Sequence, residues 1–364
     1  IDNNKVTSVM DHMRGNTVEE YSPLHLLCLR CLWIGILCFA LPAWAKLDVV
    51  FFNPGAVTDS FWGDVDKLMQ VASSKLDINL QIIHSDRNHF KMIAQLETLL
   101  KSHPSLPTHI ILVNEKQSAI KMLQILYQYP IYVQLILNDI SVAEREHLLA
   151  DPHWQTYLLP AIIPDNYAIG ADTAKNLLSR LENNKAKVLL ISGDKSTPAS
   201  VLRTQGANDY FFMQPNVIVT QTVYGQWRED IAYDQTLTLL SRYPDLTLIW
   251  TANDKMAIGV VKALREKGLE PGRDVLVSSI NTSPEILSLC QERKVSALGG
   301  GHFLAGALGL IQLKQYQETQ RYSSYEDIEL FRVLNPDSAF YQKLVARDWA
   351  GIFKTQIVDK LSQQ

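Results

Sequence analysis

Short apolar runs alternate with segments of helical spacing from Lys46 onward, and this alternation limits the possible folds more than any other feature of the chain. The run LDVVFF at 47–52 ends at Asn53-Pro54-Gly55, and an apolar run bounded by turn residues is typical of a buried strand. Residues 61–76 then repeat apolar side chains at helical spacing. Further strands are expected at 78–83, 109–113 and 131–137, and further helices at 88–101 and 117–128. The alternation predicts a parallel sheet covered by helices.

A second series with the same rhythm begins after Pro164-Asp165-Asn166. Its expected helices are 167–183, 200–213, 229–242 and 254–267, and its expected strands are 187–192, 217–223, 246–251 and 275–280. The chain is completed by a glycine-rich turn near 300, a helix at 304–317, a strand-like segment at 327–334 and a C-terminal helix at about 338–361. A chain of 364 residues fits about two domains. We therefore expect an α/β protein of two lobes, each with a mostly parallel sheet flanked by helices.

The N-terminal segment has the order of a secretory signal peptide. Arg30 precedes an apolar run from Cys31 to Leu41, Pro42 breaks the helix, and Ala43-Trp44-Ala45 matches an A-x-A cleavage site. The alternative is a membrane anchor, but the apolar run is shorter than the roughly 20 residues that span a bilayer. We expect residues 1–45 to be an N-terminal extension and signal peptide, with cleavage after Ala45 and export to the periplasm.

Charge and cysteine content exclude several classes of function. The formal net charge is −4 and the pI is about 6.2, with no block rich in Lys or Arg, which argues against nucleic-acid binding. Cys28, Cys31 and Cys38 lie in the signal segment, so Cys290 stands alone in the mature chain and forms no disulfide within it. Cys290 is expected to be a small buried residue, with a reactive thiol as the alternative. We expect the mature protein to be a monomer.

The sequence shows no residue set typical of catalysis or of metal binding. It contains no G-x-S-x-G, no H-E-x-x-H and no glycine fingerprint directly after the first strand. The segment GDKS at 193–196 lacks the glycine that a phosphate loop places before its lysine. The spacing of His84, Asp86 and His89 is weak support for a metal site, and we expect them at the surface. We therefore predict a binding protein without cofactor or metal; a periplasmic enzyme that uses the same cleft is the alternative.

Candidate binding residues lie in the loops that follow the predicted strands. In open α/β sheets the ligand crevice lies at the carboxyl ends of the strands, so two lobes that face each other place these loops in one cleft. The candidates are Asn53, Phe61, Trp62, Glu115, Arg203, Trp227, Asn253, Asn281, Gly300 and His302.

Several of these residue types suit a polar, ring-shaped ligand. Phe61 and Trp62 offer aromatic faces for stacking on a sugar ring; packing on the sheet is their alternative role. The planar fork of Arg203 can hold two ligand oxygens, and the alternative is a solvated arginine on a helix. Asn253 offers donors and an acceptor for hydroxyl groups, whereas its neighbour Asp254 is expected to cap the following helix.

From about Lys46 to Arg332 the chain resembles the type I periplasmic binding proteins, and within them the ribose- and galactose-binding group. The most specific match is the segment NDKMAIG at 253–259, which Trp227 precedes by about 26 residues. Phe61 and Trp62 match the aromatic loop after the first strand in that family. Arg203, three residues before Gly206, and the pair Asp165-Asn166 at the first crossing between lobes match as well.

The resemblance implies a ligand cleft between two lobes joined by a multi-strand hinge, with Asp165 and Asn166 at that hinge. It places the first lobe at 46–165 plus about 300–326, and the second at 166–299 plus about 327–364. Hinge closure then captures a small polar, carbohydrate-like ligand and presents it to an inner-membrane ABC permease. The alternative is a periplasmic receptor that reports its ligand to a membrane sensor kinase or cyclase.

The chain departs from the family pattern at two positions. The sugar binders place an Asp where this chain has Asn281, and a Gln near the second crossing, where this chain has Gly299-Gly300-Gly301-His302. These departures argue against a simple pentose or hexose and leave a polar ligand of different shape open. The segments NEK at 114–116, PHW at 152–154 and GGGHF at 299–303 resemble a sub-branch of ABC-type sugar-binding proteins. That sub-branch is distantly similar to the receptors for a furanosyl autoinducer.

Overall fold

The computed structural model describes residues 46–364 except 103–104, 183–184, 323–324, 326–327 and 363–364, and these residues form one compact unit. The predicted signal segment and its cleavage site lie outside the described residues. In the described part of the chain, no helix is both long and apolar enough to cross a membrane.

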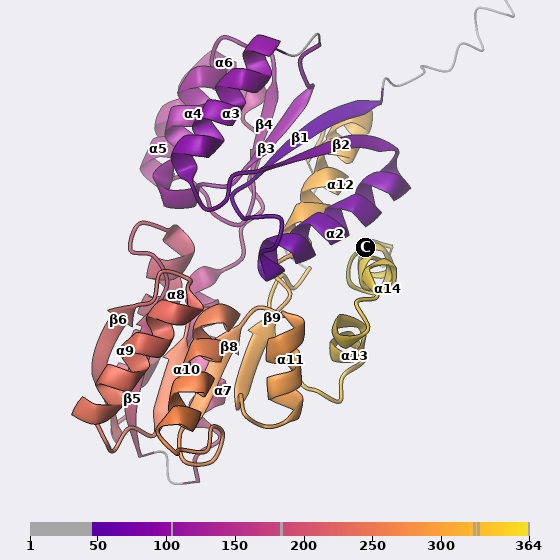
Figure 1. The fold of residues 1–364 in the computed structure, drawn as a ribbon. Coiled ribbons are helices and arrows are strands. Elements are labelled where there is room, and N and C mark those ends of the chain that lie inside the picture. The colour runs from indigo at the N-terminus through magenta and orange to yellow at the C-terminus, as the bar shows by residue number, and fades with distance from the viewer. Residues whose placement is uncertain (1–45, 103–104, 183–184, 323–324, 326–327, 363–364) are drawn as a thin grey trace, which may run out of the picture. The chain divides into compact units, whose positions relative to one another are not determined.

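The first sheet has four parallel strands in the order β2-β1-β3-β4. Its strands are β1 (Leu47–Asn53), β2 (Ile78–His84), β3 (His109–Leu112) and β4 (Tyr132–Leu135). The helices that follow these strands are α2 (Ser60–Leu76), α3 (His89–Ser102), α4 (Ala119–Leu126), α5 (Val142–Leu149) and α6 (Pro152–Tyr157), with a single 3₁₀ turn, η1 (Glu115–Gln117), before α4. We refer to this sheet and its helices as the first lobe (Figure 1).

The second sheet has six strands in the order β10-β9-β8-β7-β5-β6, and only the pair β10-β9 is antiparallel. Its strands are β5 (Ala186–Ser192), β6 (Val217–Tyr224), β7 (Leu248–Thr251), β8 (Leu276–Ile280), β9 (Ala297–Gly300) and β10 (Arg332–Val333). Its helices are α7 (Asn166–Leu178), α8 (Pro198–Phe212), α9 (Glu229–Arg242), α10 (Asp254–Glu266) and α11 (Pro284–Gln291). This second lobe confirms the predicted fold of two mostly parallel sheets flanked by helices.

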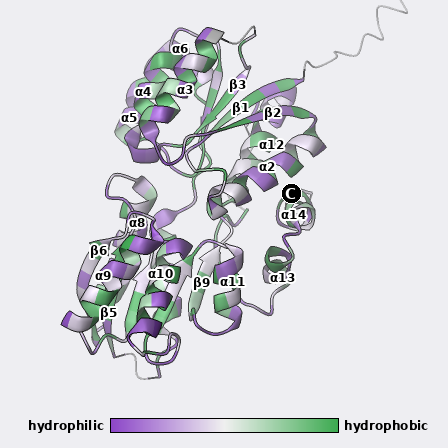
Figure 2. Cartoon of the chain, in the orientation of Figure 1, coloured by the Kyte–Doolittle hydropathy of each residue, from purple (hydrophilic) through white to green (hydrophobic). Residues whose placement is uncertain are grey.

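Apolar strands define both cores. Phe51 and Phe52 are neighbours in β1 and are both fully buried, although successive strand residues point to opposite faces. Helices therefore cover both faces of this sheet, which explains why its strands read as continuous apolar runs. Figure 2 shows the hydrophobic residues gathered on the strands and on the helix faces toward them. Each large side chain buried in this way stabilises the fold by about 1.5–3 kcal/mol.

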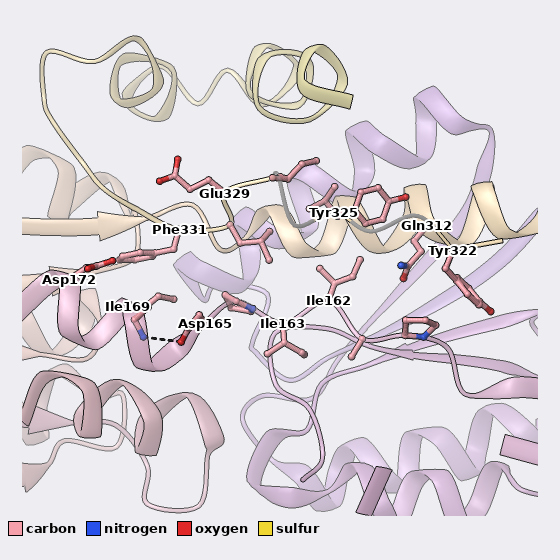
Figure 3. Close-up of a pocket in the computed structure, with 17 residues that line it drawn as sticks. Ile162, Ile163, Asp165, Ile169, Asp172, Gln312, Tyr322, Tyr325, Glu329 and Phe331 are labelled. Carbon is pink, nitrogen blue, oxygen red and sulfur yellow. Dashed lines mark hydrogen bonds between the residues drawn. The ribbon is translucent and has the colours of Figure 1, made fainter. Parts of the chain in front are cut away.

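The chain passes between the two sheets at 163–165, at 301–303 and at 328–331. The first of these segments follows Ile162, which still bridges to Ile136 beside β4, and it ends at α7. The helix after the second segment, α12 (Leu304–Thr319), packs on α2 of the first lobe. The first and third segments, with α7 and α12, line a groove of about 640 Å³, which we call the hinge groove (Figure 3).

Near the C-terminus the structure differs from the sequence-based expectation. The strand expected at 327–334 shrinks to β10, which covers only two residues. The single helix expected at about 338–361 is broken after α13 (Ala339–Val345), because Arg347 has a left-handed φ of 53°. The chain then continues through α14 (Trp349–Phe353), a π-helical turn, η2 (Lys354–Val358), and α15 (Asp359–Leu361).

The C-terminal segment contacts both lobes. The Tyr341 hydroxyl in α13 donates a hydrogen bond to the backbone oxygen of Leu287 in α11, whereas α14 packs on α2. The lobe boundaries given above therefore stay a proposal, because α13 lies with the second lobe and α14 with the first.

Candidate functional site

A small cavity lies between the two lobes, at the carboxyl ends of their strands. Its volume is about 50 Å³, and residues of both lobes line it. The lining residues are Phe61, Trp62, Arg87, Glu115, Leu137, Asn138, Thr197, Ala199, Arg203, Trp227, Asn253, Asn281 and His302. We call it the interlobe cavity. Its position is the one that the predicted topology gives for a ligand crevice.

Each lobe contributes one tryptophan that packs on a glycine. A Cβ atom on Gly55, just after β1, would lie 2.4 Å from the Trp62 ring. A Cβ atom on Gly193, just after β5, would lie 2.3 Å from the Trp227 ring. Only glycine leaves room for the two indoles at these positions. The two lobes thus use the same local arrangement to fix an aromatic side chain against the cavity.

Several lining residues have a strained backbone. Arg87 and Trp227 occupy matching loops, after β2 and β6, and have φ angles of 59° and 63°. Leu137 and Asn281, which follow β4 and β8, have φ angles of 65° and 90°. Positive φ is costly for residues other than glycine, and such strain gathers at functional sites. This clustering supports a functional role for the cavity independently of its shape.

Aromatic side chains form the wall of the cavity on the first-lobe side. The Phe61 ring stacks on the His302 imidazole, with 4.5 Å between ring centroids, and meets the Trp62 ring edge-on at 5.1 Å. Burial, and then the positive charge of Arg203, lowers the pKa of His302 well below its usual range. His302 is therefore a neutral imidazole at physiological pH, with one ring nitrogen able to accept a hydrogen bond.

Arg203 is a buried cation on the second-lobe side. Its Nε donates to the side-chain oxygen of Asn166 at 2.9 Å, and Nη1 donates to the backbone oxygen of Ala252 at 3.3 Å. Among the described residues no carboxylate forms an ion pair with it. Burial lowers the pKa of Arg203 to about 9, so the side chain is still charged at neutral pH.

Glu115 faces Arg87 across the first-lobe side of the cavity. Arg87 pairs with Asp59 at 2.6 Å, and the charge of Arg87 also stabilises the carboxylate of Glu115. Burial outweighs this attraction and raises the pKa of Glu115 above its ordinary value. Arg87 and Arg203 together with Asp59 and Glu115 give two positive and two negative charges. Of these four side chains, Arg87, Arg203 and Glu115 line the cavity, whereas Asp59 does not and pairs with Arg87.

Unpaired polar atoms are the most informative feature of the cavity. Buried polar atoms nearly always have a hydrogen-bond partner. Six lining residues nevertheless each have a buried side-chain atom without a protein partner. These atoms are Trp62 Nε1, Glu115 Oε1, Thr197 Oγ1, Trp227 Nε1, Asn281 Oδ1 and His302 Nδ1. The set holds donors and acceptors from both lobes, and it matches a ligand that itself both donates and accepts.

Direct bonds join the lobes around the cavity. The Ser60 hydroxyl donates to Asp254 at 3.0 Å, and the backbone N–H of Ala199 donates to the Asn138 side chain at 2.9 Å. Lys116 lies 3.8 Å from Asp194 in a third connection. The lobes are therefore in contact at the rim of the cavity.

Eight of the ten predicted binding residues line the cavity, and two do not. The two are Asn53 and Gly300. The Asn53 side chain bonds to Asp66 and to the backbone of Trp62 and Gly55, so it shapes the loop and does not face the cavity. Gly300 lies in β9, where a side chain would collide with Thr282.

Three further sequence-based expectations have a clear outcome. Asp165 caps α7 through its side chain, and Asn166 holds Arg203, so both lie where the chain enters the second lobe. The expected cap of α10 at Asp254 is wrong, because Asn253 accepts the bond from Met256 N–H. Asp254 instead accepts bonds from Ser60 and Asn281.

Sequence reasoning missed Arg87, Asn138 and Thr197. Arg87 follows β2 and Asn138 follows β4, so the rule that selected the other candidates also selects these two loops. Thr197 lies in the loop that follows β5, directly before α8. A hydroxyl there does not stand out from the neighbouring serines in sequence. In the described part of the chain, no group of three or more His, Cys, Asp or Glu side chains is placed to hold a metal ion.

Comparison with known proteins identifies relatives that match between about a third and five sixths of this chain. A family model described as "Periplasmic binding protein domain" matches residues 157–303. A crystal structure of a periplasmic sugar-binding protein from Pseudomonas fluorescens is 30% identical, with a TM-score of 0.73. The match covers 84% of this chain and 93% of that protein.

Two curated relatives from Escherichia coli (strain K12) are more distant. The D-allose-binding periplasmic protein is 27% identical over 136 residues, which is 37% of this chain and 43% of that protein. The ribose import binding protein is 23% identical over 256 residues, which is 69% of this chain and 78% of that protein. The chain thus spans less than half the length of the first of these relatives in the alignment.

Proposed function

Because this chain belongs to the family of periplasmic binding proteins, which bind solutes and are not enzymes, we propose that it captures a small uncharged sugar between its lobes. The observation that carries the proposal is the set of six buried, unpaired polar atoms in the interlobe cavity. A sugar hydroxyl donates one hydrogen bond and accepts others, so a ring with several hydroxyls satisfies mixed donors and acceptors on all sides. The sugar-binding relative from Pseudomonas fluorescens supports this ligand class.

Charge and size narrow the ligand class further. Arg87 is paired with Asp59, and the lining residues Arg203 and Glu115 carry opposite charges, which favours an uncharged ligand. Pockets for drug-sized ligands occupy about 300–1,000 Å³, whereas this cavity has a volume of about 50 Å³. The closed form thus has room for about one or two water molecules, which is less than a sugar ring occupies. We propose that a single ring enters when the lobes separate and is then seated between the two tryptophans and the Phe61 ring.

We propose hinge closure as the mechanism of capture. The lobes share the cavity almost equally, so a ligand gains its full set of contacts only when both lobes surround it. A ligand shifts an open–closed equilibrium only through such differential contacts. Rotation about the three connecting segments opens the cavity for entry, and the rim bonds at Ser60 and Asn138 form again on closure.

The ribose import binding protein is a relative of this chain, and its name supports transport as the biological role. We therefore propose that the closed form of this protein presents its sugar to an ABC permease in the inner membrane. Reporting to a membrane sensor is the competing outcome. Reconstituted permease separates the two, because only a transport partner hydrolyses ATP faster when the closed binding protein is added.

A thermal-shift screen of residues 46–364 tests the ligand class directly. The panel holds D-ribose, D-allose, D-galactose, L-arabinose and myo-inositol, with galacturonate and glucosamine as charged controls. A ligand present at a hundredfold excess over its Kd stabilises the fold by about 2.7 kcal/mol, which is a clear rise in melting temperature. We expect stabilisation by at least one uncharged compound and none by the two charged ones. Stabilisation by the charged compounds alone would overturn the proposed ligand class.

A further inference from the structure

The C-terminal segment forms a connection between the lobes that is separate from the three hinge segments. After β10 the chain runs along the second lobe, where Tyr341 is fully buried and donates to the Leu287 oxygen at 2.6 Å. It then reaches the first lobe, where α14 packs on α2. Trp349 at the start of α14 meets Phe303 edge-on, with 5.7 Å between ring centroids. Figure 1 shows the segment passing from beside α11 to α2.

Arg347 lies between α13 and α14 and binds both lobes at once. Its guanidinium donates to the carboxylate of Asp64 in α2 through both Nη atoms, and Nη1 also donates to the backbone oxygen of Thr282 at 3.1 Å. Asp64 is 1% exposed and accepts a further bond from the Thr282 hydroxyl at 2.9 Å. Asp64, Thr282 and Arg347 thus join α2, the loop after β8 and the C-terminal segment in one cluster around the buried Asp64 carboxylate.

This cluster adjoins the interlobe cavity without lining it. Asp64 lies one helical turn after Phe61, and Thr282 directly follows Asn281. The Asn281 side chain donates to Asp254 at 2.9 Å, and Asp254 accepts the bond from Ser60. The first turn of α2 is therefore tied to the second lobe twice, once through Asp254 and once through the Arg347 cluster.

Building on the proposed function, we propose that Arg347 is a positioning residue that holds the lobes closed. It does so by clamping α2, which carries Phe61 and Trp62, against the loop that carries Asn281. When the lobes separate, the bond between Thr282 and Asp64 breaks and a buried carboxylate loses a partner. Without Arg347 the clamp between α2 and the loop after β8 keeps only the bond from the Thr282 hydroxyl to Asp64, which favours separation of the lobes. The C-terminal segment thereby sets the balance between open and closed forms.

Distance measurement between spin labels tests this role without any ligand. The labels are placed on the exposed positions Val142→Cys in the first lobe and Met213→Cys in the second, in residues 46–364, where Cys290 is buried. We expect the Arg347→Ala variant to show a longer and broader distance distribution than the parent. The Arg347→Lys variant keeps the positive charge but loses the planar guanidinium that donates several hydrogen bonds. We expect its distance distribution to lie between those of the parent and of Arg347→Ala.

The matched control is Lys354→Ala in the same C-terminal segment. Lys354 is exposed and pairs with Asp359 in the same segment, so this change is expected to leave the label distance unaltered. If Arg347→Ala fails to fold, the distance distribution of the Arg347→Lys variant tests the proposal. Parent-like distributions in the folded Arg347 variants overturn the proposal, as does an equal shift in Lys354→Ala. Since no sugar is present, these outcomes are independent of whether the ligand proposal holds.

Discussion

The interlobe cavity and the hinge groove are both lined by segments from the two lobes, yet they differ in almost every other respect. The hinge groove is the larger, about 640 Å³ against about 50 Å³. Its lining is largely aliphatic and aromatic, with Asp165, Asp172 and Glu329 exposed at its edge (Figure 3). Six cavity residues have a buried polar atom without a partner, whereas none of the described residues that line the groove has one.

This difference shows that volume is a poor guide to a binding site in this molecule. If the connecting segments move on closure as proposed, loose packing between them would account for the larger volume of the groove. A ligand site is recognised by what is left unsatisfied, because a buried donor or acceptor without a partner costs about 1–3 kcal/mol in the free protein. The cavity keeps that cost at six positions and adds strained backbone at four. The described residues that line the hinge groove have no comparable set of unpaired polar atoms.

Truncation of the buried arginine provides the strongest test of this difference. We expect Arg203→Ala to weaken sugar binding by about thirtyfold, because buried arginines at binding sites are worth about 2 kcal/mol or more. Titration calorimetry with the tightest sugar from the screen measures the change. Glu329→Ala in the hinge groove is the matched control and should leave affinity unaltered. Equal affinity of Arg203→Ala and the parent would remove Arg203 from the site.

Conversion of the cavity tryptophans to phenylalanine isolates the unpaired indole nitrogens. Trp62→Phe and Trp227→Phe keep an aromatic face but lose the N–H donor, so each should weaken binding by about five- to tenfold, since one hydrogen bond contributes about 1 kcal/mol. Trp154→Phe, in the core of the first lobe, should lower stability without changing affinity. If all three variants bind equally well, the indole nitrogens do not contact the ligand.

Glu115→Gln is expected to raise the stability of the folded protein at high pH. Burial raises the pKa of Glu115, so the folded protein holds this proton more tightly than the unfolded chain does. The stability that the protonated Glu115 carboxyl contributes is fully present below the pKa that it has in the unfolded chain. This stability is lost as the pH rises through the higher pKa that it has in the folded protein. Melting temperature of the variant should therefore exceed that of the parent at pH 8, and the difference should shrink toward pH 4. A constant difference across this range contradicts the assigned cause.

The smallest effect is expected at the edge of the hinge groove. Asp172 is exposed and forms no ion pair among the described residues, so Asp172→Asn should change neither melting temperature nor sugar affinity measurably. Thermal unfolding and titration calorimetry on the purified variant measure both. A tenfold change in affinity would show that the groove influences closure and would weaken its contrast with the cavity.

The fold and most of the cavity were accessible from the sequence because both depend on local rules. Apolar runs gave the strands, and the rule that ligand crevices follow strands selected Phe61, Trp62 and Arg203. Asn53 was selected by the same rule but turns back to bond Asp66, a choice that depends on side-chain geometry. The strand–helix rhythm did not predict the break at Arg347, where the backbone is left-handed and the side chain bonds to Asp64, a residue distant in sequence.

The two tryptophans that pack on Gly55 and Gly193 have one more consequence. Indole fluorescence responds to the polarity around the ring and to hydrogen bonding at its nitrogen. Both rings lie at the cavity with that nitrogen unpaired, whereas the indole nitrogen of Trp250 is already bonded to Thr173. If the proposed sugar occupies the cavity, we expect it to alter the emission of one ring in each lobe. Intrinsic fluorescence would then record the binding of the solute from two opposite sides.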